Sequence, residues 1–133
     1  MGDRCSVQIS FRNEADARSF GVASGEGERF WDETNDTHRL FVVTVHEANW
    51  AWVSQLEAAA KAGVEFFGKH DAGSEYPEED FVTSRKKVLY LRFGLIPYEV
   101  VGKGRIVIPR GARGAAKAFY SAQAKLFKKW GLQ

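Results

Sequence analysis

The chain has 133 residues, of which 44% are hydrophobic and 14% aromatic, enough for one packed core and too few for two. Its single cysteine, Cys5, excludes an internal disulfide, and we expect a buried thiol and a cytoplasmic protein. The sequence contains no apolar run of about 18 residues, so we expect neither a membrane span nor a membrane partner. These features predict one domain over residues 1–133.

The net charge of +2 hides an uneven distribution of charge along the chain. Residues 1–80 contain 7 Lys/Arg and 16 Asp/Glu, whereas residues 81–133 contain 12 Lys/Arg and 1 Asp/Glu. Such asymmetry is typical of proteins with an electrostatic partner. The alternative is that the two parts fold against each other and neutralise one another, and the sequence leaves both interpretations open.

The first elements can be predicted from hydrophobic periodicity. Residues 6–12 alternate between apolar and polar side chains, which predicts a half-buried strand. Asn13 is then placed to cap a short helix, with Asp16 three positions later and glycines from residue 21 to stop it. The polar run 32–38 predicts a loop. Residues 39–46 are almost continuously apolar and predict a central strand covered on both faces.

In residues 47–62 the period changes to that of a helix. Val53, Leu56 and Ala60 fall on one helical face, and Gly63 stops the helix. Residues 64–67 predict a short strand, followed by a loop of thirteen residues, 68–80. A loop of that length is often functional.

The last third of the chain predicts strands at residues 88–93, 98–101 and 105–108, then a helix from about residue 112. We expect the strands to complete the sheet and the helix to pack on it through a stripe that ends at Leu126 and Trp130. The elements together predict an α+β domain, with a mostly antiparallel sheet of about five strands and two main helices packed on it.

No spacing of residues in the chain points to a reaction. His38 and His46 lie too far apart on an extended segment to share a metal ion, and His70 with Asp71 and Glu75 lacks a metal-binding spacing. Cys5 has no neighbouring His to activate it. We therefore expect no metal, no cofactor and no catalytic residue.

The basic end of the chain is the strongest candidate for a binding surface. Its PRGARG segment places arginines beside glycines at the start of a helix, where backbone N–H groups and the helix dipole favour an anion. The segment has neither a Walker nor a dinucleotide-binding spacing, and a hairpin with solubilising lysines is the alternative interpretation. The predicted phosphate- or nucleic-acid-binding residues are Arg105, Arg110, Arg113, Lys117, Tyr120, Lys125 and Lys128.

The acidic loop is the second candidate, as a surface that competes with nucleic acid for the basic groove of a nucleoprotein. The alternative is an ordinary solvated run of acids. The predicted partner-binding residues are His70, Asp71, Glu75, Tyr76, Glu78 and Glu79.

One stretch carries a family resemblance. Within Trp50–Tyr76, a helix ending in AAAKAGVEFFG is followed by HDAGSEY. This stretch resembles small uncharacterised proteins encoded by bacteriophages and other mobile elements. The resemblance implies an origin for the protein, but it assigns no activity and no site residue.

The sequence therefore favours a small non-enzymatic binding protein of phage origin. Its expected partner is nucleic acid or a nucleoprotein complex, or a host protein such as a defence complex that it would antagonise. The alternative is a small phosphoester-processing enzyme that combines the loop carboxylates with the basic surface. The sequence leaves open whether the protein is a monomer or a homodimer.

Overall fold

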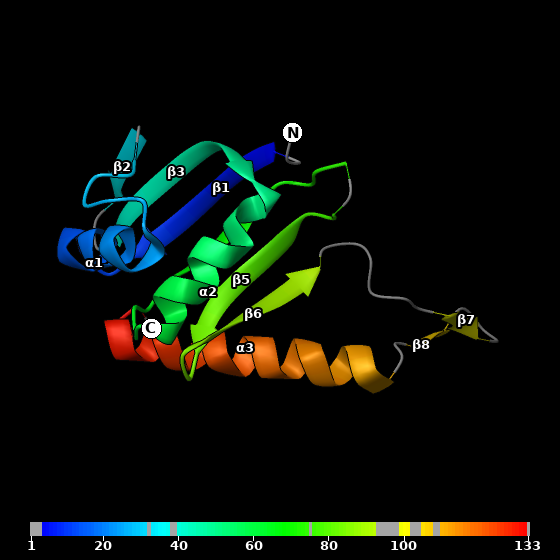
Figure 1. Ribbon diagram of the computed structural model, residues 1–133. Coiled ribbons are helices and arrows are strands. Elements are labelled where there is room, and N and C mark those ends of the chain that lie inside the picture. Colours follow the sequence, from blue (N-terminus) through cyan, green and yellow to red (C-terminus); the bar gives the residue numbers. More distant parts are fainter. Residues whose placement is uncertain are drawn as a thin grey trace.

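The protein is built on a six-stranded antiparallel sheet in the order β2-β3-β1-β4-β5-β6 (Figure 1). The computed structural model describes residues 4–31, 33–37, 40–74, 76–92, 99–101, 105–107 and 110–132. The strands are β1 (Arg4–Phe11), β2 (Glu33–Thr37), β3 (Leu40–Asn49), β4 (Phe67–His70), β5 (Glu79–Ser84) and β6 (Lys87–Arg92). A separate two-stranded sheet consists of β7 (Glu99–Val101) and β8 (Arg105–Val107).

The helices cover both faces of the sheet. Helices α1 (Glu14–Ser24) and α2 (Val53–Lys61) pack on one face, where Phe20 and Leu56 join the main core. Helix α3 (Arg110–Trp130) packs on the other face, over β5 and β6. Because side chains alternate along a strand, Phe81 belongs to the core beneath α2 while its neighbour Val82 packs with α3. The start of α3 extends past the sheet towards β7 and β8 (Figure 1).

The first part of the chain has a recognisable topology. The sequence β1-α1-β2-β3-α2-β4, with strand order 2-3-1-4 and all neighbours antiparallel, is the split βαβ arrangement of ferredoxin-like folds. The β5–β6 hairpin widens this unit at the β4 edge, and α3 covers the added strands from behind. A fold of this kind carries many functions, so it assigns none here.

The α+β class and most of the predicted elements are confirmed. Asn13 caps α1, because its Oδ1 accepts a hydrogen bond of 2.9 Å from the backbone N–H of Asp16. The apolar stripe of α3 is buried through Phe119, Ala122, Leu126 and Trp130. The thiol of Cys5 is buried, as expected.

Two predicted loops are wrong in part. The run 32–38 contains β2, whose polar residues suit the edge of a sheet. The loop 68–80 contains the end of β4 and the start of β5, so the connection is only residues 71–78. The predicted strand 64–67 accordingly begins at Phe67. The polar and charged residues of both segments concealed their strand character in the sequence.

Three other predictions need correction. The helix predicted from residue 47 begins at Val53, because β3 continues to Asn49 and Trp50–Trp52 forms a 3-10 turn (η1) with left-handed backbone. Strand β3 is second from the edge, and it is β1 that lies between β3 and β4. Strands β7 and β8 lie within the strands predicted at residues 98–101 and 105–108, but they pair with each other instead of completing the main sheet.

Candidate anion-binding site

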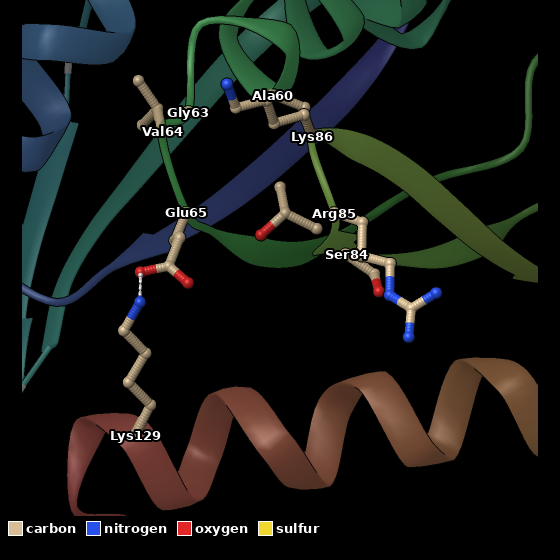
Figure 2. A pocket seen from close by; sticks show the side chains of 9 residues that line it. Ala60, Gly63, Val64, Glu65, Ser84, Arg85, Lys86 and Lys129 are labelled. Carbon is tan, nitrogen blue, oxygen red and sulfur yellow. Dashed lines mark ion pairs between the residues drawn. The ribbon is translucent and has the colours of Figure 1, made fainter.

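A basic hollow lies where the β5–β6 turn and the end of α2 approach α3 (Figure 2). Its volume is about 250 Å³, and a neighbouring hollow of about 180 Å³ shares the wall formed by Glu65, Arg85 and Lys129. We call these two hollows together the anion-binding site. Its lining residues are Ala60, Gly63, Val64, Glu65, Thr83, Ser84, Arg85, Lys86, Ala122, Lys125, Leu126 and Lys129.

The β5–β6 turn supplies two of the cations. Ser84 pairs with Lys87 across the hairpin, which leaves Arg85 and Lys86 as the two turn residues. Both have left-handed backbone, with φ of 50° for Arg85 and 63° for Lys86, a geometry for which hairpins prefer Asn-Gly. A non-glycine residue in this region is destabilised by about 1–2 kcal/mol. The turn therefore presents two long cationic side chains where a smaller pair would fold more easily.

Helix α3 supplies the other two cations. Lys125 and Lys129 lie one helical turn apart, beside the buried residues Ala122 and Leu126, so they project from the edge of the helix that faces the turn. The Lys129 Nζ forms an ion pair of 2.8 Å with Oε1 of Glu65, which Figure 2 shows across the hollow. The burial of the α3 stripe thus fixes where these two lysines lie.

The electrostatic balance of the site is strongly positive. Arg85, Lys86, Lys125 and Lys129 are exposed cations, whereas Glu65 is the carboxylate in the lining. A third hollow of about 440 Å³ continues from Lys86 and is lined by Glu57, Lys61, Lys86, Lys87 and Val88. The cationic surface therefore extends from α3 across the turn to α2.

A different pocket lies at the other end of α2. Its volume is about 360 Å³ and its walls are Trp50, Ala51, Val53, His70, Tyr76 and Glu79, and we call it the aromatic pocket. The Tyr76 ring lies 6.1 Å from the Trp50 ring and 5.6 Å from the imidazole of His70, measured between centroids. Trp50 and Val53 remain exposed at its rim, at 48% and 39%.

The floor of the aromatic pocket is a buried His–Glu pair. The His70 Nδ1 lies 2.8 Å from the carbonyl oxygen of Asp71, so it donates a proton there, and Nε2 lies 3.1 Å from Oε1 of Glu79. The other carboxylate oxygen of Glu79 lies 3.7 Å from Nε of Arg92. Because both ring nitrogens face acceptors, the doubly protonated imidazolium satisfies this arrangement best.

Burial and charge shift the pKa values of the groups around this floor. For His70, burial is the largest effect and lowers the pKa, but the bonds to Glu79 and Asp71 and their charges together raise it above its usual value. For Tyr90, burial raises the pKa far above its usual range, assisted by the charges of Glu57 and Glu79. Burial also raises the pKa of Asp80, against the opposing charge of Lys69.

The raised pKa of His70 predicts a pH dependence of stability. The ion pair with Glu79 should contribute in full below the unfolded-state pKa of about 6.5, and the contribution should be lost as the pH rises through the folded-state pKa. Urea unfolding of the wild type and of His70→Gln between pH 5.5 and 9 measures this contribution as the difference between their free energies of unfolding. The stability advantage of the wild type should shrink towards alkaline pH, whereas a difference independent of pH would contradict the assignment.

The structure distributes the predicted binding residues differently from the expectation. On α3, Lys125 lines the anion-binding site, whereas Lys117, Tyr120 and Lys128 are exposed outside its lining. The side chains of Arg105, Arg110 and Arg113 lie outside the part of the chain that the structure describes, although the backbone places Arg110 and Arg113 within α3 instead of ahead of it.

The predicted partner-binding residues are divided as well. His70, Tyr76 and Glu79 meet in the aromatic pocket, and Asp71 contributes its carbonyl oxygen. Glu78 is exposed outside the pocket lining, and Glu75 is not among the described residues.

Sequence reasoning missed Arg85, Lys86 and Lys129 at the basic site and Trp50 at the aromatic pocket. A usable signal was present for the turn, because the apolar runs of β5 and β6 leave a short polar link between them, the pattern of a tight hairpin. Nothing in the sequence indicated that this link would meet the end of a helix forty residues later.

The two parts of the chain do neutralise each other locally. Lys129 pairs with Glu65, and Arg92 pairs with Glu79, so each ion pair joins the basic to the acidic part. The cations around the β5–β6 turn nevertheless outnumber the acids there. Folding therefore leaves a positive surface.

Within the described ranges, no group of three or more His, Cys, Asp or Glu side chains is placed to hold a metal ion, and no helix is long and apolar enough to cross a membrane. The comparisons with protein-family models, curated proteins and solved structures found no match for the chain.

Proposed function

We propose that this is a non-enzymatic binding protein that engages nucleic acid or a nucleoprotein complex at the anion-binding site. One observation carries the proposal. Two segments about forty residues apart, the β5–β6 turn and the end of α3, bring Arg85, Lys86, Lys125 and Lys129 together around two adjoining hollows. Polyanions are the ligands that such a cluster of exposed cations favours.

Phosphate suits the chemistry of these side chains. The planar guanidinium of Arg85 can donate two hydrogen bonds to one phosphate, and the lysines act as mobile point charges. Because all four are exposed, the attraction arises mainly from the release of counterions from the polyanion. The phage resemblance of residues 50–76 extends the proposal to a host defence nucleoprotein as partner.

The position of the acids favours binding over phosphoester hydrolysis. An enzyme that combined the loop carboxylates with the basic surface would need both in one site. Glu79 and His70 instead line the aromatic pocket at the start of α2, whereas the cations surround the end of α2.

Salt dependence tests the proposal. Binding of a fluorescein-labelled single-stranded oligonucleotide can be measured by fluorescence anisotropy at increasing salt. A plot of log K against log salt concentration should have a slope of about −3, because each of four phosphate contacts on a single strand contributes about −0.7 to the slope. An oligonucleotide of the same sequence with an uncharged backbone should not bind. A flat salt response, or equal binding of the uncharged strand, would exclude the anion-binding mechanism.

A further inference from the structure

The aromatic pocket and the anion-binding site are joined along α2. Trp50 and Val53 line the aromatic pocket, and Ala60 lines the anion-binding site, about 10 Å beyond Val53 along α2 at 1.5 Å per residue. Glu57 and Lys61 lie one and two turns after Val53 and line the third hollow. The hollows therefore follow one another along one side of α2, from exposed aromatic rings to a cluster of cations.

The backbone of η1 keeps an indole at the surface. Trp50, Ala51 and Trp52 all have left-handed φ, of 51°, 52° and 56°. This conformation, strained by about 1–2 kcal/mol for each non-glycine residue, buries Trp52 in the core and leaves Trp50 at the rim beside Tyr76.

The polar floor of the aromatic pocket suits the edge of a nucleobase. The Glu79 carboxylate accepts from His70 and faces Arg92, but a carboxylate has about four lone-pair sites, so further acceptor capacity remains. The exocyclic amino group of a base is a donor of the required kind. The pocket thus offers an aromatic face for stacking and an acceptor for the base edge.

We propose that the ligand is single-stranded nucleic acid, with one base stacked on Trp50 in the aromatic pocket and the adjoining phosphates led along α2 to the anion-binding site. This inference rests on the proposed function and specifies its substrate class. An aromatic platform continuous with a cationic groove is the general design of proteins that bind single strands. Duplex bases are already stacked on each other, so a duplex would offer phosphates but no base for Trp50.

The experiment compares an oligonucleotide with an abasic strand of equal length, using wild type and Trp50→Ala. We expect the wild type to bind the base-containing strand about tenfold more tightly, from stacking. Trp50→Ala should remove this preference and leave the affinity for the abasic strand unchanged, while Trp50→Phe should restore part of it. Urea unfolding of each variant shows whether the fold is retained.

A second variant tests the route between the pockets. Glu57 places a carboxylate between Val53 and Lys61 in the third hollow, so Glu57→Lys should strengthen binding of both strands several-fold at low salt. Glu47→Lys makes the same charge change at an exposed residue outside the lining and is the matched control.

The outcomes separate the two proposals. Equal, salt-dependent binding of both strands with no effect of Trp50→Ala would overturn base stacking and leave the anion-binding function standing. Tighter binding of duplex than of single strand, or identical effects of Glu57→Lys and Glu47→Lys, would also overturn the inference. Failure of both strands to bind would overturn the inference together with the proposed function.

Discussion

Replacing Gly68 with alanine should destabilise the domain by more than about 3 kcal/mol, the upper range for overpacking a well-packed site. Gly68 lies in β4 and pairs with Ile9 of β1 on one side and Phe81 of β5 on the other. A Cβ atom there would overlap the carbonyl oxygen of Gln8 and approach Cζ of Phe81 to 2.9 Å. Since the first contact is with backbone, relief requires strands β1 and β4 to move apart.

The Phe81 ring explains why the sheet needs a glycine at this position. Phe81 is 1% exposed and makes edge-on contact with Phe66 at 6.0 Å in the main core, so its ring cannot turn away without opening a cavity. Chemical denaturation followed by far-UV circular dichroism measures the loss. Gly114→Ala is the matched control, because Gly114 is exposed in α3 and an added Cβ would meet no neighbouring element within 4 Å. This variant should raise the free energy of unfolding by about 0.5–1 kcal/mol, since alanine favours a helix more than glycine does. Equal effects of the two substitutions would contradict this account.

Much of the fold could be predicted because periodicity and capping are local signals. The alternation of residues 6–12, the Asn13 cap and the α3 stripe each depend on neighbours within a few positions, and the structure confirms all three. Strand β2 was missed because an edge strand is specified by its pairing with β3, not by its own composition. The start of α2 was misplaced because the left-handed turn at Trp50–Trp52 contains no glycine, the residue that usually indicates such a turn in a sequence.

The candidate site was harder to predict because it forms by convergence. The sequence predicted the buried stripe of α3 and named Lys117, Lys125 and Lys128 of the same helix as binding residues. It could not predict which other element lies beside them: the β5–β6 turn approaches the helix at Lys125, so Lys125 and Lys129 share a hollow with Arg85. Sequence gives the angular position of a residue on a helix, whereas tertiary packing decides which positions face another element.

This distinction predicts a large difference between two charge reversals of equal size. The double substitution Arg85→Glu and Lys125→Glu should weaken binding of the labelled oligonucleotide by at least about 100-fold at low salt, since two charge-assisted contacts of roughly 1.5–3 kcal/mol each are lost and become repulsive. Lys117→Glu with Lys128→Glu changes the net charge by the same amount on exposed positions outside the lining. This variant should lose only long-range electrostatic attraction, so its affinity for the oligonucleotide should fall several-fold at low salt. Salt should abolish this loss of affinity because it screens long-range attraction.

Anisotropy titrations of both double variants against the wild type, at low salt and at about 150 mM, measure the difference. At the higher salt, screening over about 8 Å should bring the Lys117 and Lys128 variant back to wild-type affinity and leave the Arg85 and Lys125 variant impaired. Equal losses in the two variants would mean that the ligand senses only net charge. A larger loss in the Lys117 and Lys128 variant would move the binding surface to the outer face of α3, because each variant reverses two positive charges and the two pairs lie at different places on the molecule.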